Sequence, residues 1–155
     1  MAIVASLMKT EMVTVSPDDT VAAAARLMNQ NKVGAVLVVA GGAATGLFSE
    51  RDLLTRVVAA GTDPSKVRVS EVASSPVIAV ARTASVRECV DLLRAKRIRH
   101  LAVVDGGKPI GILSARDFLE AVVEGFEKLV DKNQYDAVVA SGADPYDHIG
   151  GSYGR

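Results

Sequence analysis

Two short stretches of this chain place a serine and an aspartate three residues apart, each with a glycine three residues before the serine. They are GLFSERDL at 46–53 and GILSARDF at 111–118. If each serine ends a strand and opens a helix, free backbone N–H groups lie there and favour an anion. A serine hydroxyl could then donate to a phosphate or ribose oxygen. An aspartate in the first helical turn could accept both hydroxyls of a ribose, as acidic residues do in dinucleotide folds. The glycine would let the ligand approach closely. The pattern indicates a nucleoside-phosphate site in each stretch.

The same residues have a structural interpretation. Ser49 and Ser114 are good helix N-caps, and Asp52 and Asp117 are suitable capping-box partners three residues on. The glycines would then only allow close packing of a hairpin. Because a capping group can also hold a ligand, both interpretations stay open at this point.

The two stretches belong to a repeat that covers most of the chain. A shift of 65 residues places Val38-Val39 on Val103-Val104 and Gly41-Gly42 on Gly106-Gly107, with no gap anywhere. The chain is therefore two copies of one unit, residues 3–65 and 68–127, followed by an extension at 128–155.

Each copy has the element order β-α-β-β-α. The predicted strands are 12–15, 35–39 and 45–49, matched by 77–80, 101–104 and 110–114. The first helix follows Ser16-Pro17 with Thr20 or Asp18 as its N-cap, and the closing helices cover 50–60 and 115–130. The Gly-Gly pairs suit a tight hairpin turn. Uninterrupted apolar strands indicate coverage on both faces. We predict an α/β (α+β) fold in which two such repeats pack with pseudo-two-fold symmetry and their sheets face each other.

Two longer phrases carry a family resemblance. They are VSPDDTVAAAARLM at 15–28 and KRIRHLAVVDGGKPIGILSARDFL at 96–119. With the repeat and the doubled motif, they resemble a tandem pair of CBS (cystathionine-β-synthase) domains, or Bateman module, over residues 3–127. The resemblance implies regulatory binding of AMP, ADP, ATP or S-adenosylmethionine in clefts between the copies. It also implies that the protein forms a homodimer.

The resemblance implies a role for particular residues. Asp52 and Asp117 would hold ribose hydroxyls, with Ser49 and Ser114 beside ribose or phosphate. One cleft would combine Ser114 and Asp117 with Val13, Val33 and Gly34. The other would combine Ser49 and Asp52 with Ile78, Ile98 and Arg99. Leu47 and Ile112 are the matching residues just inside the third strands.

The copies differ at one pair of positions. Arg99-His100 stands where the first copy has Gly34-Ala35. A cation can neutralise a phosphate through charge-assisted hydrogen bonds, which Gly and Ala cannot do. We predict unequal clefts, with phosphate preference set near Arg99 and His100. The alternative is that the basic run 94–100 is only a solvated helix face.

Composition restricts the class of protein. The 18 basic and 18 acidic residues argue against non-specific nucleic-acid binding. Because residues 94–100 are rich in basic side chains, nucleic-acid binding through this run is the least favoured alternative. The single cysteine, Cys89, excludes an intramolecular disulfide and fits a small buried residue in a reducing compartment. No basic-plus-apolar leader or long apolar span is present, so we expect a cytoplasmic protein without a membrane segment.

No pattern for catalysis or metal binding stands out. The two histidines, His100 and His148, are far apart, and there is no phosphate-binding GxxxxGK[ST] loop. Glu50 is replaced by Ala115 in the second copy. We therefore expect no catalytic residue, no metal and no obligatory cofactor. The competing class is a structural pairing or partner-binding module with empty clefts. The extension is predicted to end in a mobile tail, or to cross onto a dimer mate.

Overall fold

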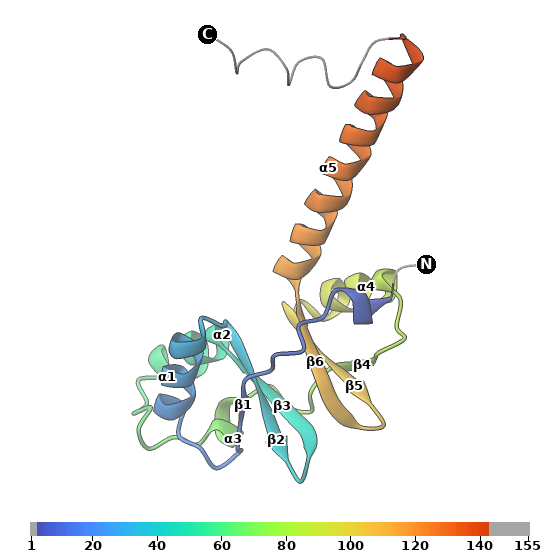
Figure 1. The fold of residues 1–155 in the computed structure, drawn as a ribbon. Helices are drawn as coiled ribbons and strands as arrows, with labels where there is room; N and C mark the ends of the chain where they lie inside the picture. The colour runs from blue at the N-terminus through green and yellow to red at the C-terminus, as the bar shows by residue number, and fades with distance from the viewer. Residues whose placement is uncertain (1–2, 143–155) are drawn as a thin grey trace. The chain divides into compact units, whose positions relative to one another are not determined.

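The computed structural model describes residues 3–142. The chain divides into two units, one that runs to Asp117 and one that begins at Phe118, and each is described by itself. The first unit contains the strands of both repeats, which form two three-stranded sheets of the same design (Figure 1). The predicted α/β class with two repeats is confirmed.

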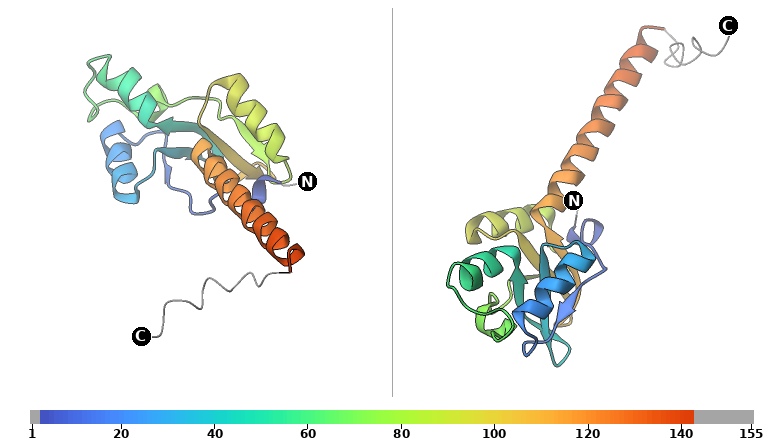
Figure 2. Two further views of the ribbon diagram at one scale, coloured as in Figure 1. Left: turned by 90° about the horizontal axis from the view of Figure 1, so that it is seen from above. Right: turned by 90° about the vertical axis from the view of Figure 1, so that its left-hand side faces the viewer.

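Each sheet has its first strand parallel, and its third antiparallel, to the central strand. The first sheet consists of β1 (Thr14–Val15), β2 (Ala35–Ala40) and β3 (Ala43–Ser49). The second consists of β4 (Ala79–Ala81), β5 (His100–Asp105) and β6 (Lys108–Ser114). Strands β3 and β6 lie against each other, which brings the sheets together (Figure 2). The central residues Leu37, Leu101 and Phe48 are fully buried, as expected for strands covered on both faces.

Local sequence signals account for the helices and hairpins. Helix α1 (Val21–Asn31) begins at Thr20, one of the two expected caps, whose hydroxyl accepts from the Ala23 amide at 3.2 Å. Helix α4 (Val86–Lys96) begins in the same way at Ser85. The Gly-Gly turns have φ of +58° and +78° in the first hairpin and +55° and +81° in the second. These angles confirm the predicted tight turns, because only glycine adopts them without strain.

The closing helix of the first copy differs from the expected regular helix. It is a short α2 (Glu50–Asp52) followed by a π-helical segment η2 (Leu53–Val58). The Thr55 hydroxyl bonds the Arg51 carbonyl at 2.7 Å, and the Ala59 amide reaches back five residues to Leu54 at 2.9 Å. A side chain that competes for a helix carbonyl favours such a widened turn.

The closing helix of the second copy is longer than expected. Helix α5 spans Ala115–Ala140, beyond the predicted end at residue 130. The first part of the predicted extension is therefore helical. The predicted mobile tail begins at Ser141, and from residue 143 on it lies outside the described residues.

The two repeats exchange the segments that precede their first strands. Helix α3 (Val69–Val72) stands in the second copy of the sequence, yet Val69 and Val72 are buried in one cluster with Val21 and Val36 of the first copy. The Val69 amide donates to the Asp19 carbonyl at 2.9 Å. The short helix η1 (Val4–Ser6) does the reverse. The Val4 amide donates to the Ala84 carbonyl at 2.8 Å, so each sequence copy completes the other's core.

The motif glycines make room for these exchanged segments. A Cβ on Gly46 would lie 3.1 Å from the Ser74 carbonyl oxygen, and one on Gly111 would lie 3.0 Å from that of Lys9 and 2.7 Å from Met8 Sδ. Lys9 and Ile112 exchange two backbone hydrogen bonds at 2.9 and 3.0 Å. The expectation that the glycines make room for a ligand is wrong, because neighbouring protein backbone occupies that space.

We expect Gly111→Ala to destabilise the fold by about 1–3 kcal/mol, since the added methyl group must push the exchanged segment away from β6. Urea denaturation measures the change. Gly125→Ala is the matched control. It lies inside α5 with nothing within 4 Å of the new methyl group, so it should stabilise the chain by about 0.5–1 kcal/mol. Equal stability of the Gly111 variant and the wild type would contradict close packing at this contact.

Cys89 is a buried core residue. Its side chain is fully inaccessible. Burial, with Glu88 nearby, raises the pKa of the thiol, so it stays protonated at neutral pH. This agrees with the interpretation as a small apolar core residue.

Two candidate ligand clefts

The first unit has two clefts, each lined by residues of both repeats. We name them by their aspartates. The Asp117 cleft has a volume of about 620 Å³, and the Asp52 cleft one of about 640 Å³. Both volumes lie in the range of small-molecule sites.

The structure places the residues that the resemblance implied in two clefts. The Asp117 cleft contains Val13, Val33, Gly34, Ile112, Ser114 and Asp117. The Asp52 cleft contains Leu47, Ser49, Asp52, Ile78, Ile98 and Arg99. Arg99 and His100 line both clefts, whereas the sequence placed Arg99 in one of them. Their contact with a ligand stays a prediction.

The apolar walls are positioned by equivalent backbone bonds. The Val13 carbonyl accepts from the Leu37 amide at 3.1 Å, and the Ile78 carbonyl accepts from the Ala102 amide at 3.2 Å. Val33 and Ile98 each follow a left-handed residue that ends the preceding helix, Lys32 and Arg97 respectively. The repeat therefore places an aliphatic pair at the same place in each cleft.

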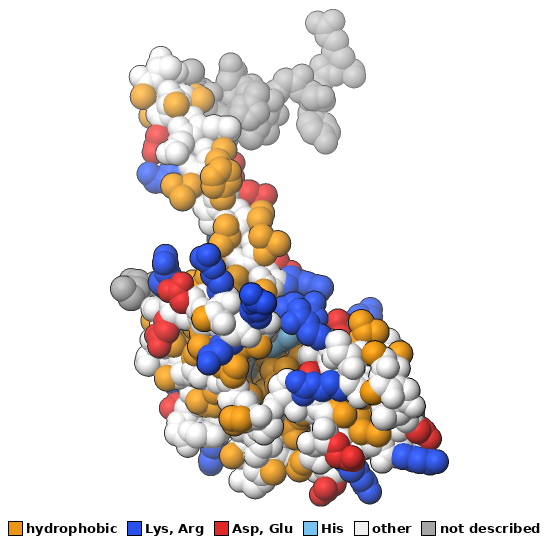
Figure 3. Space-filling view, turned by 180° about the vertical axis from the view of Figure 1, so that it is seen from behind, with side chains coloured by type: hydrophobic (Ala, Val, Ile, Leu, Met, Phe, Trp, Pro, Cys, Tyr) orange, Lys and Arg blue, Asp and Glu red, His pale blue; other side chains and the backbone are white. Residues whose placement is uncertain are grey.

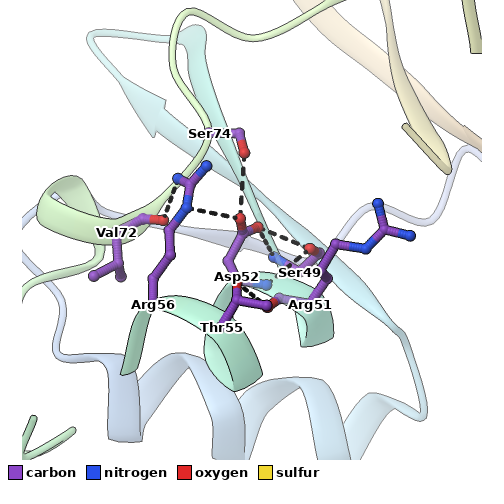
Figure 4. A network of polar contacts seen from close by, with 7 residues as sticks. All are labelled: Ser49, Arg51, Asp52, Thr55, Arg56, Val72 and Ser74. Atoms are coloured by element: carbon purple, nitrogen blue, oxygen red, sulfur yellow. Dashed lines mark hydrogen bonds and ion pairs between the residues drawn. The ribbon is translucent and has the colours of Figure 1, made fainter. Parts of the chain in front are cut away.

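The Asp52 carboxylate is held by several donors at once (Figure 4). Its Oδ2 accepts from the Ser49 amide at 2.9 Å and the Ser49 hydroxyl at 2.7 Å. Its Oδ1 accepts from the Ser74 hydroxyl at 3.3 Å and faces Arg56 Nε at 3.6 Å. The Asp52 residue is 6% exposed and lines its cleft. The capping interpretation is confirmed here, since this is a complete capping box.

The Asp117 carboxylate repeats the capping box and has a different partner for its other oxygen. Oδ2 accepts from the Ser114 amide and hydroxyl, both at 2.7 Å. Oδ1 lies 2.9 Å from Lys9 Nζ. Lys9 and Ser74 are 65 residues apart, so the exchanged segments place a cation on one aspartate and a hydroxyl on the other. Burial raises the pKa of Asp117, but hydrogen bonds from Ser114 and the ammonium of Lys9 outweigh it and lower the pKa.

The lowered pKa of Asp117 predicts an acid-dependent contribution to stability. The ionised carboxylate stabilises the folded chain above the ordinary value of 3.8, and the contribution is lost as the pH falls through the lower folded-state pKa. We expect Asp117→Asn to melt at a lower temperature than the wild type at neutral pH. As the pH falls below 3.8 and the carboxylate takes up a proton, the difference in melting temperature should narrow. Thermal unfolding followed by circular dichroism tests this, and a constant gap would speak against it.

His100 is in a less polar environment than a surface histidine. Burial, then the positive charge of Arg99, lowers its pKa, against the opposing effects of Asp117 and Glu50. The imidazole is therefore neutral at pH 7, and His100 can offer a phosphate a hydrogen bond rather than a charge.

Sequence reasoning missed several residues of these sites. Lys9, Ser74 and Arg56 contact the aspartates, and Glu50 lines the Asp117 cleft. The 65-residue shift does match Lys9 with Ser74, so a signal existed. The shift does not show that the segments carrying Lys9 and Ser74 each pack on the other repeat. Only this exchange brings the two side chains to the aspartates.

The fold and the paired clefts define a tandem-repeat α/β module, and comparison with known proteins identifies its family. A family model described as the CBS domain matches residues 4–59 and 69–124. The chain therefore belongs to the CBS-domain family and carries two such domains in tandem.

A curated relative and several solved structures are similar over most of the chain. The CBS domain-containing protein YhcV of Bacillus subtilis (strain 168) is 36% identical over 117 residues, which cover 76% of this chain and 83% of that protein. Two longer curated relatives, 35% and 34% identical, are matched over 61% and 60% of their length. A solved protein with CBS domains from Burkholderia ambifaria MC40-6 is 35% identical, with a TM-score of 0.75 and coverage of 79% of this chain and 95% of that one.

Two further solved structures bear on ligand binding and on self-association. The CBS domain protein PAE2072 from Pyrobaculum aerophilum is complexed with AMP, and it is 30% identical, with a TM-score of 0.69 and coverage of 74% of this chain and 88% of that one. The hexameric CBS-CP12 protein from bloom-forming cyanobacteria is 26% identical, with a TM-score of 0.74 and coverage of 94% and 90%. Relatives of this chain thus include one bound to AMP and one that forms an oligomer.

The described part of the chain has neither a metal-binding cluster nor a membrane-spanning helix. Among residues 3–142, no group of three or more His, Cys, Asp or Glu side chains could hold a metal ion. In the same residues, no helix has the length and apolar character needed to cross a membrane.

Proposed function

We propose that this protein is a non-catalytic regulatory protein that binds an adenosyl ligand, namely AMP, ADP, ATP or S-adenosylmethionine. The observation that carries the proposal is the pairing, in each cleft, of a buried aspartate with aliphatic walls from both repeats. A carboxylate can accept both hydroxyls of a ribose. The aliphatic pairs, Val13 with Val33 and Ile78 with Ile98, would cover the two faces of the purine. The relative complexed with AMP supports this ligand class.

The exchanged segments offer a route from ligand to signal. In the structure, Lys9 and Ser74 contact the aspartate oxygens that a ribose would use. A ribose that takes over these oxygens weakens the hold on the segment that carries Lys9 or Ser74, and each segment links the two repeats. Occupancy would therefore change how the repeats pack. A ligand shifts this equilibrium only by its differential affinity for the two forms.

We further propose that the protein is a homodimer held in part by α5. Its apolar side chains Leu119, Val122, Phe126 and Leu129 follow a spacing of three and four residues and are 60–67% exposed. Such a stripe is typical of a helix that packs on a second helix. The hexameric relative supports self-association in this family.

The homodimer proposal predicts that Phe126→Glu with Leu129→Glu yields a monomer, because two charges would have to be buried in the helix contact. Light scattering after size exclusion measures the mass. Glu124→Gln, with Glu127→Gln, is a control on the same helix that should leave the mass unchanged. A wild type that is itself monomeric, or a double variant that stays dimeric, would reject the helix contact.

The direct test of ligand binding is a thermal-shift panel with AMP, ATP and S-adenosylmethionine. A ligand that binds the folded state raises the melting temperature, by about 2–4 °C or more per kcal/mol of stabilisation at this chain length. The competing function is a pairing module with empty clefts, which the complete capping boxes favour. The panel separates them: if no adenosyl compound shifts the melting temperature, the pairing module is the correct description.

A further inference from the structure

The two clefts have the same number of basic side chains and different numbers of acidic ones. The Asp52 cleft has four basic residues, Arg51, Arg56, Lys96 and Arg99, against one carboxylate. The Asp117 cleft has four, Lys9, Lys32, Arg99 and Arg116, against three carboxylates. Figure 3 shows Lys and Arg side chains gathered around a hollow in which a histidine is visible, and His100 is the histidine that lines both clefts. The charge difference therefore comes from acids, Glu11 and Glu50, that only the Asp117 cleft contains.

The repeat isolates Glu50 as a particular difference. The Glu50 amide donates to the Gly34 carbonyl at 3.0 Å, and the Ala115 amide donates to the Arg99 carbonyl at 2.9 Å. These pairs are equivalent under the 65-residue shift and have the same backbone geometry. One pair has a carboxylate and a glycine, and the other has an alanine and a guanidinium. All four residues line the Asp117 cleft, and of the four only Arg99 also lines the Asp52 cleft, so Glu50 adds a carboxylate to the Asp117 cleft alone.

The Glu50 carboxylate occupies the space that the small residue leaves. Its Oε2 lies 3.4 Å from where a Cβ on Gly34 would stand. The negative charges of Asp117 and Glu50 both act to raise the pKa of His100. All three residues line the Asp117 cleft. A phosphate chain that extended from a ribose held by Asp117 would meet this carboxylate. A chain that extended from Asp52 would meet basic side chains and no second carboxylate.

We propose that the two clefts select ligands of different charge, and that Glu50 is the residue that sets the difference. The Asp52 cleft takes an adenosine polyphosphate. The Asp117 cleft takes an adenosyl ligand with at most one phosphate, because Glu50 repels a longer chain. The inference rests on the proposed function, since it requires that the clefts bind adenosyl ligands.

Calorimetric titration of AMP and ATP into single-cleft variants tests this. Asp52→Asn leaves the Asp117 cleft, where we expect AMP to bind at least about tenfold more tightly than ATP, a difference of about 1.4 kcal/mol. Asp117→Asn leaves the Asp52 cleft, where ATP should bind more tightly than AMP. If Asp52→Asn does not fold, Ile78→Trp fills the same cleft and serves instead.

The role of Glu50 is tested in the variant that retains the Asp117 cleft. Glu50→Gln, and Glu50→Ala, which copies the matched Ala115, should raise ATP affinity about tenfold and change AMP affinity much less. Glu50 is exposed, so neither change disturbs the core. Glu88→Gln, which removes an exposed carboxylate outside both clefts, should have no effect.

The possible failures are distinguishable. If the wild type binds neither AMP nor ATP, the proposed function is wrong and the inference falls with it. If nucleotides bind but each cleft prefers the same one, only the inference is wrong. If the clefts differ and Glu50→Gln leaves ATP affinity unchanged, the assignment to Glu50 is overturned.

Discussion

Replacement of both Val69 and Val72 by alanine is expected to loosen the first repeat, although both residues stand at the start of the second copy. They are 0% and 7% exposed and belong to the core cluster that contains Val21 and Val36. Each loss of two buried methyl groups should cost about 2 kcal/mol, and the double variant roughly 4 kcal/mol. Urea denaturation measures the loss. Hydrogen exchange should show faster opening of α1 and β2 than of α4 and β5.

Val4→Ala is the matched control, since Val4 is the repeat equivalent of Val69 and is also fully buried. Its amide donates to Ala84 in the second copy. It should therefore speed exchange in α4 and β5 and leave α1 protected. If both variants loosened the copy in which they stand in the sequence, the exchange of segments would not describe the protein in solution.

Asp52→Asn and Asp117→Asn are each expected to remove high-affinity binding from one cleft and to spare the other. The amide lacks the charge, and one of its two polar atoms is a donor that cannot accept from a ribose hydroxyl. A hydrogen bond to a charged group is worth about 1.5–3 kcal/mol, so affinity at the altered cleft should fall about 10- to 100-fold. Calorimetric stoichiometry should fall by one site in each single variant.

These variants need a control for folding, because both aspartates also complete capping boxes. The melting temperature of each variant without ligand measures the loss of stability that comes from the capping box, separately from the loss of binding. Asp91→Asn removes an exposed carboxylate on α4 that pairs with Arg87 and lines neither cleft, and it should leave nucleotide binding intact. Full affinity and stoichiometry in both folded variants would show that the aspartates are helix caps and no more.

The sequence by itself determined the architecture of each repeat, because the signals that specify it are local. Thr20 caps α1 through the Ala23 amide, three residues away, and Gly41-Gly42 closes a hairpin between adjacent strands. The capping boxes around Asp52 and Asp117 also lie within four residues. A second copy at a shift of 65 residues then indicated two clefts of the same kind.

The tertiary structure alone decided which segment completes which site. An apolar residue such as Val69 suits the core of either repeat. The sequence pattern around it is therefore the same whether its segment packs on its own repeat or on the other one. The crossing brings Lys9 to Asp117 and Ser74 to Asp52, and the packing of the repeats turns Glu50 into one cleft only. These contacts join residues far apart in the chain, and no local signal encodes them. For that reason the sequence predicted unequal clefts whose difference lies at Arg99 and His100, whereas the structure places both residues in both clefts and shows a difference chiefly in the carboxylates.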